Sequence, residues 1–311
     1  MNYKDKKIIV AIPCYNEEKS IKKVINGFQK ELPGAGIVVF DNNSTDRTQK
    51  IAAAEGAKII HEKRQGKGWV VRSICERLDA DIYVMVDGDD TYPAEEVHKL
   101  IEPILNDEAD MVVGNRLGQD NHNSIRPLHQ FGNWCITSTL NLIFRADYKD
   151  VLSGYRVFTK DVAKNIPLIT MGFEIETELA LQALEHGYIV KEVPIRYGSR
   201  PQGSLSKLSS FSDGYRIMVT MVMLLRDHKP HHFFTFIFII LGACSSLLII
   251  YAYTLTRLLN VFLISGIILG IAAFLFLVTG LILSAVNTRF AELSAIIRKN
   301  NYFAVSKEKE L

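Results

Sequence analysis

Three carboxylates stand within four positions at the end of an apolar run, in the stretch YVMVDGDDTYPAEE (residues 83–96): Asp87, Asp89 and Asp90. Carboxylates packed a few ångströms apart raise one another's pKa unless a cation or hydrogen-bond donors offset their charge. A hard divalent ion such as Mg²⁺ prefers oxygen ligands of this kind and often shares them with the phosphates of a substrate. The stretch therefore indicates a metal-assisted site for a diphosphate, although a turn whose aspartates cap a helix also explains it.

Further segments carry residue types that could bind a nucleotide. RQGKGWVVR (residues 64–72) places Lys67 between two glycines before a predicted helix, which suits phosphate contact, although a solvated lysine loop also explains it. Asp41 ends a predicted strand, where its carboxylate could accept hydrogen bonds from a base or a ribose. Gly88, between two of the aspartates, would let a ligand approach the backbone closely.

A doubly wound α/β domain would bring these segments together. Short apolar, β-branched runs alternate with amphipathic helical patterns, which predicts a mostly parallel sheet with helices on both faces. The predicted strands cover residues 7–13, 36–41, 57–61, 81–87 and 109–115. In such sheets ligands bind beyond the carboxyl ends of the strands, where PCYNEE, DNNSTD and DGDD stand. No G-x-G-x-x-G follows the first strand, which disfavours a dinucleotide-binding fold.

The remainder of the globular region continues this alternation. It contains a helix near 127–145, the segment SGYRVF (153–158), a helix near 173–186 and a strand near 188–197. Three glutamates alternate in the second helix, either as a solvated face or as contacts to a substrate: Glu174, Glu176 and Glu178. Ser44 or Thr45 could cap the helix after the second strand.

Composition narrows the functional classes. The chain has 311 residues and a formal net charge of +2, so nothing suggests binding to a nucleic acid. Its four cysteines are scattered without a C-x-x-C spacing, which fits a reducing compartment and predicts neither a disulfide nor a metal site. The apolar stretch behind the N-terminal lysines has only about six residues, too few for a signal peptide.

Two long uncharged runs near the C-terminus predict a transmembrane hairpin. Residues 233–255 give 23 uncharged positions and residues 258–286 give 29, and each run can cross a hydrocarbon core of roughly 30 Å. Lysines and arginines flank the outer ends of the hairpin, whereas its short turn holds only Arg257. The positive-inside rule therefore places both termini and the globular region in the cytoplasm.

The sequence divides into four parts on these grounds. The predicted parts are a cytosolic globular domain (1–210), a helix in the membrane interface (211–232), the transmembrane hairpin (233–286) and a cytosolic tail (287–311). An ordinary amphipathic packing helix is the alternative for the second part. His231 and His232 stand at the edge of the first span and are predicted as interfacial anchors rather than metal ligands.

Several motifs, in this order and spacing, resemble those of family 2 glycosyltransferases, which have the GT-A fold. They are VAIPCYNEEKSI (10–21), DNNSTDRT (41–48), QGKG (65–68) and the D-x-D strand end (87–89). Others resemble the polyprenyl-phosphate glycosyltransferase branch, to which dolichyl-phosphate mannose synthase and undecaprenyl-phosphate glucosyltransferase belong. They are GNR (114–116), D-x-x-SGYRVF (150–158), GFEIETEL (172–179) and RPQGSLSKL (200–208). The resemblance covers about residues 7–228.

The resemblance implies roles for the matching residues. Nucleotide binding would fall on Pro13, Tyr15, Glu17, Asp41, Lys67, Asp87 and Gly88. Asp87 and Asp89 would hold Mg²⁺ or Mn²⁺ on the donor diphosphate. Binding of the acceptor and donor phosphates would fall on Arg116, Arg126, Arg200 and Lys207. Catalysis would rest on Asp89, Arg116 and Asp90, and the last of these either orients the nucleophile or caps a helix.

Two positions depart from the family pattern. Relatives often read D-A-D-x-Q where this chain has Thr91 in place of Gln, so Thr91 is either a poorer metal ligand or leaves that place to water. The stretch RPQGSLSKL is one residue longer than usual, which loosens the assignment of Lys207.

The implied reaction is the inverting transfer of a monosaccharide from a UDP- or GDP-sugar to undecaprenyl or dolichyl phosphate at the cytoplasmic membrane face. A phosphate monoester has a second pKa near 6, so the acceptor is mostly dianionic at neutral pH and needs no general base. The protein has to hold two anions together and stabilise an oxocarbenium-like state with a departing nucleotide. We expect UDP rather than GDP, although no residue argues for it, and a homo-oligomer is compatible with the sequence.

Three alternatives stay open. DGDDT fits the D-x-D-x-T pattern of phosphoaspartyl hydrolases, with Asp87 as nucleophile, but that pattern usually closes the first strand and here it closes the fourth. A transferase of the same fold could use another acceptor, such as a diacylglycerol or a growing glycan. An inactive membrane-anchored scaffold subunit would be expected to have lost carboxylates or arginines that are present here.

Overall fold

The computed structural model of the chain describes residues 6–117, 127–144, 146–170, 172, 175–198, 219, 222–254 and 259–309. The chain divides into two compact units, Met1–Met218 and Val219–Leu311. Three predicted phosphate-binding residues lie outside the described residues: Arg126, Arg200 and Lys207. Glu174 lies outside them as well.

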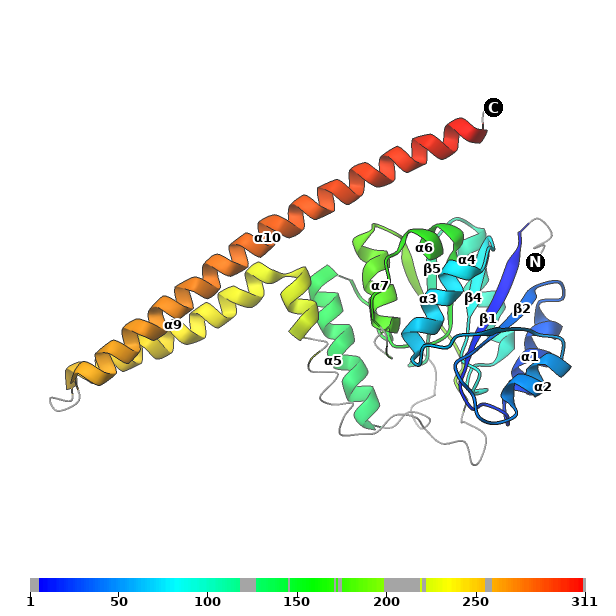
Figure 1. Cartoon of the computed structure of the whole chain (residues 1–311), viewed down its shortest axis with the longest axis horizontal. Coiled ribbons are helices and arrows are strands. Elements are labelled where there is room, and N and C mark those ends of the chain that lie inside the picture. The colour runs from blue at the N-terminus through cyan, green and yellow to red at the C-terminus, as the bar shows by residue number, and fades with distance from the viewer. Residues whose placement is uncertain are drawn as a thin grey trace. The chain divides into compact units, whose positions relative to one another are not determined.

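The first unit is built on one seven-stranded sheet with the order β3-β2-β1-β4-β6-β5-β7. Figure 1 labels β1, β2, β4 and β5 of this sheet together with several of the helices that flank it. The strands are β1 (Ile8–Cys14), β2 (Gly36–Asp41), β3 (Lys58–His61), β4 (Ile82–Met85), β5 (Met111–Asn115), β6 (Arg156–Thr159) and β7 (Val190–Pro194). β6 runs antiparallel to both of its neighbours, β4 and β5, and the other pairs are parallel. The predicted mostly parallel, doubly wound sheet is confirmed.

Both faces of the sheet are covered, which explains why its strands read as continuous apolar runs. In β1, Ile8, Val10 and Ile12 join the core that packs under α1 (Ile21–Glu31) and α4 (Val97–Leu105). The intervening Ile9 and Ala11 are equally buried on the opposite face. The remaining helical elements of this unit are α2 (Thr48–Ala54), α3 (Lys67–Arg77), the short η1 (Ala94–Glu96), α5 (Pro127–Phe144), α6 (Lys160–Asn165) and α7 (Ile175–Glu185).

The parallel strands β1, β2 and β4 end side by side, so the loops that follow them meet at one edge of the sheet. The register pairs Cys14 with Asp41 across β1 and β2, and Ala11 with Met85 across β1 and β4. This edge is where the sequence places its candidate residues. One prediction here is wrong: neither Ser44 nor Thr45 caps α2, which begins at Thr48.

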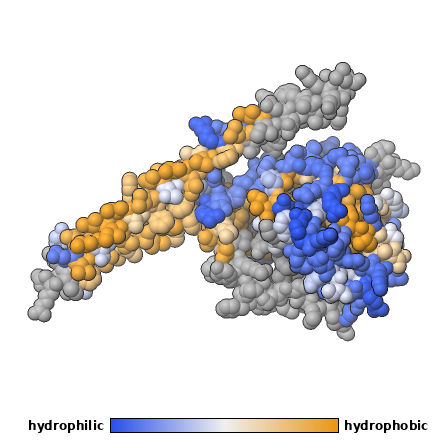
Figure 2. All heavy atoms as spheres, in the orientation of Figure 1, coloured by the Kyte–Doolittle hydropathy of each residue, from blue (hydrophilic) through white to orange (hydrophobic). Residues whose placement is uncertain are grey.

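The second unit contains two long helices, α9 (Pro230–Thr254) and α10 (Leu259–Lys309), which pack against each other. Residues 230–253 and 260–293 are long and apolar enough to cross a membrane. Most of their large apolar side chains are exposed, so they are not the buried core helices of a soluble domain (Figure 2). α10 remains helical beyond residue 286, where the sequence predicts the end of the second span.

Candidate active site

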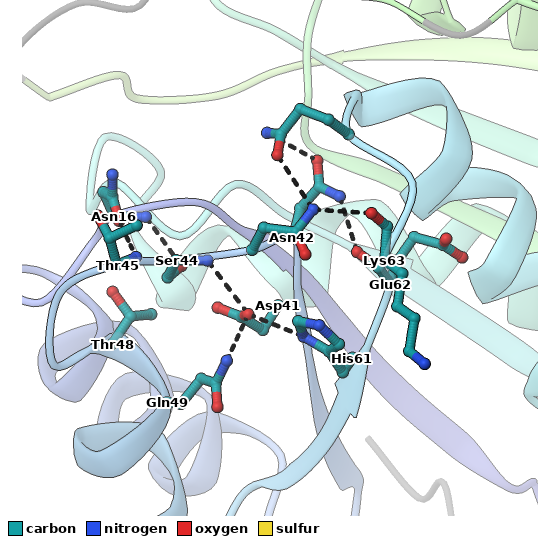
Figure 3. Close-up of polar contacts among 12 residues, drawn as sticks. Asn16, Asp41, Asn42, Ser44, Thr45, Thr48, Gln49, His61, Glu62 and Lys63 are labelled. Carbon is teal, nitrogen blue, oxygen red and sulfur yellow. Dashed lines mark hydrogen bonds and ion pairs between the residues drawn. The ribbon is translucent and has the colours of Figure 1, made fainter.

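Asp41, the last residue of β2, is fully buried, and within the described residues only one of its carboxylate oxygens makes hydrogen bonds. Oδ2 accepts hydrogen bonds from the backbone N–H of Ser44 (3.2 Å) and from the Gln49 amide (2.6 Å), and lies 3.2 Å from Nδ1 of His61 (Figure 3). Oδ1 is buried and has no hydrogen-bond partner among the residues that the structure describes. A buried acceptor without a donor costs free energy, so this position lacks one donor that a ligand could supply.

The loops after β1 and β2 are tied to each other, and this fixes the predicted nucleotide residues at the end of β1. Asn16 donates its backbone N–H to the Ser44 hydroxyl (3.0 Å), and its side-chain oxygen accepts from the N–H of Thr45 (2.8 Å) (Figure 3). The Glu17 N–H donates to the Thr48 hydroxyl at 2.8 Å. Asn16 has a left-handed φ of 54°, a conformation that asparagine tolerates better than most residues. Beside them, Pro13 and Tyr15 are half-buried, whereas Glu17 is buried.

Each of the three aspartates after β4 makes an ion pair or a hydrogen bond with a different side chain, and these contacts offset the repulsion among the three carboxylates. Oδ1 of Asp87 pairs with the Lys67 ammonium at 2.5 Å. Oδ1 of Asp89 accepts from the hydroxyl (2.6 Å) and the N–H (3.2 Å) of Thr91. Asp90 pairs with Lys23 of α1 at 2.7 Å. The positive charges of Lys67 and Lys23 and the hydrogen-bond donors of Thr91 thus offset the repulsion among the three carboxylates.

Asp90 does not cap a helix. The next helical element, η1, has Pro93 at its N-cap position and no side-chain capping hydrogen bond. Asp90 itself adopts a left-handed φ of 60°, a conformation that aspartate, like asparagine, tolerates better than most residues. The capping alternative is therefore wrong, and the predicted role in orienting the nucleophile stays a prediction.

Lys67, at the first turn of α3, bridges Asp87 and Glu176 of α7. Its Nζ lies 2.5 Å from Oε1 of Glu176, and its side chain is only 13% exposed. Burial alone would lower the pKa of Lys67, but the attraction of the Asp87 and Glu176 carboxylates outweighs it and raises that pKa above its ordinary value. The solvated-loop alternative for Lys67 is wrong, because its ammonium is held between two carboxylates.

Glu176 and Glu178 do not form a solvated face, since they are 4% and 8% exposed. The Glu178 carboxylate accepts hydrogen bonds from the N–H groups of Ile169 (2.8 Å) and Thr170 (2.9 Å), which fixes the loop before α7. Glu176 pairs instead with Lys67, and its Oε2 is buried with no hydrogen-bond partner from the described residues. The sequence signal for this difference is weak, because both glutamates share one helical stretch.

Glycines allow the closest packing around the aspartates. A Cβ on Gly154 would clash with Oδ2 of Asp87 and lie 2.8 Å from its Cγ. A Cβ on Gly88 would lie 2.6 Å from the Sγ of Cys14, so Gly88 packs against the end of β1. The Gly154 N–H donates to the hydroxyl of Tyr92 at 2.9 Å. The SGYRVF segment thus lies directly against Asp87.

Arg116, after β5, forms a forked ion pair with Asp150. Nε and Nη2 each lie 2.7 Å from one carboxylate oxygen, and the Arg116 N–H donates to Oδ2 at 2.9 Å. Burial of Asp150 would raise its pKa, but the charge and hydrogen bonds of Arg116 outweigh this and hold that pKa below its usual range. The guanidinium also lies 5.5 Å from the ring centre of Tyr197. Asp150 is the first residue of the D-x-x-SGYRVF motif, but the sequence does not indicate its ion pair with Arg116.

Arg156, in β6, is a second buried cation that the sequence did not single out. It is fully buried; Nε donates to the carbonyl of Ser153 (3.0 Å) and Nη2 to that of Val151 (2.5 Å). Nη1 has no partner. Burial lowers the pKa of Arg156 to about 10, although the charges of Glu176 and Asp150 oppose the shift.

Asp87 and Asp89 fit a metal ion that shares its coordination with a substrate. Among the residues that the structure describes, no group of three or more histidines, cysteines or carboxylates could hold a metal by itself. Mg²⁺ is commonly bound by one or two carboxylates and completes its coordination with water and substrate phosphates. The donor set is therefore suited to a metal–diphosphate complex rather than to a structural metal.

Comparison with known proteins identifies the class of enzyme. Glucosyl-3-phosphoglycerate synthase from Mycobacterium tuberculosis, solved with Mn²⁺, UDP and phosphoglyceric acid, superposes with a TM-score of 0.59 at 21% identity, over 72% of this chain and 78% of that one. The fold is thus the GT-A glycosyltransferase fold. Residues 9–166 match the family described as Glycosyl transferase family 2. The chain belongs to this family, and the phosphoaspartyl hydrolase alternative is set aside.

Two relatives extend the similarity beyond the family domain. Glycosyltransferase AglJ of Haloferax volcanii is 33% identical over 228 residues, which cover 73% of this chain and 75% of the relative. The dolichyl-phosphate hexose transferase of the same organism is 29% identical over 222 residues, or 71% of this chain and 95% of the relative.

Proposed function

We propose that this chain is an inverting, metal-dependent glycosyltransferase that moves a monosaccharide from a nucleotide sugar to a polyprenyl phosphate at the cytoplasmic face of a membrane. The observation that carries the proposal is the pair Asp87 and Asp89 just after β4, with Asp87 held by the Lys67 ammonium and Asp89 by the Thr91 hydroxyl. The relative named dolichyl-phosphate hexose transferase supports a lipid phosphate as acceptor.

The chain's own residues would bind and orient two anionic substrates. Asp87 and Asp89 would hold Mg²⁺ or Mn²⁺, which supplies Lewis acidity toward a diphosphate when bound. Lys67 places a buried positive charge at the same strand end, where it would stabilise the departing nucleotide. Arg116, fixed by Asp150, would hold a phosphate. Because a phosphate monoester acceptor is mostly dianionic at neutral pH, no general base is needed.

Asp41 supports UDP rather than GDP as the nucleotide. Uracil presents one ring N–H to a carboxylate, whereas guanine presents N–H donors on two adjacent atoms and so matches both oxygens. Oδ2 of Asp41 already contacts Ser44, Gln49 and His61, whereas Oδ1 has no hydrogen-bond partner among the residues described by the structure. A single open acceptor matches the uracil edge. The UDP complex of the structural neighbour agrees with this choice.

Membrane anchoring would come from α9 and α10. Their exposed apolar side chains need a nonpolar surround, and the flanking basic residues support cytoplasmic termini. In this arrangement the transferase domain and its lipid acceptor share one membrane face.

The test uses purified full-length protein in detergent with Mn²⁺, a polyprenyl phosphate and a panel of UDP- and GDP-sugars. Mass spectrometry should detect a lipid-linked monosaccharide from a UDP-sugar, and EDTA should abolish it. Asp89→Asn should stop turnover while the protein remains folded. If the protein binds nucleotide but no donor gives a lipid product, the acceptor is a different one; absence of nucleotide binding would favour the scaffold alternative.

A further inference from the structure

Lys67 links a proposed metal ligand to an interior carboxylate. Its ammonium lies 2.5 Å from Oδ1 of Asp87 and 2.5 Å from Oε1 of Glu176. The Asp87 side chain is 26% exposed and that of Glu176 is 5% exposed. Asp87 is thus the more exposed partner of Lys67, and Glu176 is the interior one.

The carboxylate of Glu176 can accept a further hydrogen bond. Oε2 of Glu176 is buried and has no hydrogen-bond partner in the described part of the chain, a situation that costs free energy. An ammonium group carries three donors, so Lys67 can engage both oxygens of Glu176. The buried guanidinium of Arg156 also interacts electrostatically with Glu176.

We propose that Lys67 is an internal cation that occupies Asp87 until a divalent metal binds there, and that Glu176 is the positioning residue that then takes Lys67 over. The inference rests on the proposed metal-dependent function. A divalent ion at Asp87 repels an ammonium at short range, and the open oxygen of Glu176 gives that ammonium a second acceptor. Glu176 thereby decides how strongly Lys67 competes with the metal.

This role differs from that of a carboxylate that only supports the fold. Glu178, two residues further along α7, is also buried, but it binds the N–H groups of Ile169 and Thr170 and the hydroxyl of the latter. Its hydrogen bonds fix a loop and do not involve Lys67. Glu178 is therefore the matched control for Glu176.

The proposal predicts a specific pattern of metal affinities. Among the described residues, Glu176→Gln leaves Asp87 as the one charged partner of Lys67. A metal then has to displace a more tightly held cation, and the Kd for the metal should rise about tenfold. The double variant Lys67→Gln/Glu176→Gln lacks the competing cation, and its Kd should return to within about threefold of the wild-type value. Glu178→Gln should bind the metal as the wild type does.

The experiment is a Mn²⁺ titration of the full-length protein in detergent, in which the electron paramagnetic resonance signal reports the free ion. UDP and GDP are present in parallel series, without sugar or acceptor, so the result does not depend on turnover. Thermal unfolding shows that each variant is folded. The rise in Glu176→Gln and its reversal in the double variant support the proposal.

Three other outcomes overturn it. If the wild type binds Mn²⁺ and Glu176→Gln binds equally well, Glu176 does not control Lys67. If the double variant binds as weakly as Glu176→Gln, Glu176 acts by a route other than Lys67. A wild-type protein that binds no Mn²⁺ with either nucleotide would overturn the proposed metal-dependent function together with this inference.

Discussion

The hydroxyl of Thr91 donates a 2.6 Å hydrogen bond to Oδ1 of Asp89, and the Thr91 N–H donates to the same oxygen at 3.2 Å. Both residues are almost inaccessible, with exposures of 1% and 4%. From the sequence, Thr91 was expected either to be a poor metal ligand or to leave its place to water. In the structure it orients the carboxylate of the second aspartate in the D-x-D motif.

Thr91→Val should therefore impair the site without changing its volume appreciably. The valine keeps the backbone N–H but removes the shorter hydrogen bond, and the Kd for Mn²⁺ should rise and kcat should fall by about tenfold or more. Thr91→Ser, which keeps the hydroxyl, is the matched control and should stay close to wild type. Turnover and Mn²⁺ titration measure both effects, and equal behaviour of the two variants would remove the role assigned to the hydroxyl.

The sequence predicted the sheet well, because buried parallel strands leave a simple signal. Runs such as GIVVFD have apolar side chains for both faces, and β2 (Gly36–Asp41) begins and ends where expected. Turn chemistry was less predictable: Asp46, rather than Ser44 or Thr45, accepts the Thr48 N–H at the start of α2 (2.9 Å). Short polar side chains compete for such positions, and spacing alone does not decide between them.

The candidate site was predictable in its residue types but not in its pairings. Strand ends identified Asp41, Asp87 and Asp89, because the carboxyl ends of parallel strands meet at one edge. The partners Glu176 and Asp150 come from parts of the chain far from Lys67 and Arg116 in sequence. Such contacts depend on the order of the strands and on the placing of α7, which local patterns do not contain.

Gly154→Ala should damage the metal site through Asp87. The new methyl group would lie 2.8 Å from Cγ of Asp87, so this carboxylate has to move. We expect a rise of about tenfold or more in the Kd for Mn²⁺. Gly198→Ala is the control, because its Cβ would make ordinary contact with the carbonyl oxygen of Thr91 at 3.6 Å. Similar Mn²⁺ affinities of the two variants would contradict the close approach of Gly154 to Asp87.

The stability of the first unit should depend on pH through Glu62. The Arg64 side chain, which hydrogen-bonds to Glu62, and the Ser73 hydroxyl outweigh the effect of burial and lower the pKa of Glu62 from 4.5 to about 2. Because the pKa is lower in the folded state, the stabilisation is complete above about pH 4.5 and is lost as the pH falls through about 2.

Glu62→Gln removes this titration. The difference in unfolding free energy between wild type and variant should be constant from neutral pH to about pH 5 and shrink at lower pH. Denaturant unfolding of the two proteins at a series of pH values measures it. A difference that does not change with pH would show that Glu62 has the same pKa in the folded and unfolded states.

The packing of α9 against α10 provides a test in the second unit. A Cβ on Gly266 of α10 would lie 2.6 Å from Cγ1 of Ile249 and 3.2 Å from the carbonyl oxygen of Ser245, whereas a Cβ on Gly242 would meet nothing within 4 Å. The Ser245 hydroxyl also donates to the Gly266 carbonyl at 2.7 Å. Gly266→Ala should therefore force the two helices apart and destabilise the unit by about 1–3 kcal/mol.

The control variant Gly242→Ala should be neutral or slightly stabilising, since alanine is a better helix former than glycine. Reversible unfolding of the full-length protein in mixed detergent micelles compares the two, and equal loss of stability would mean that Gly266 is not at a close helix contact.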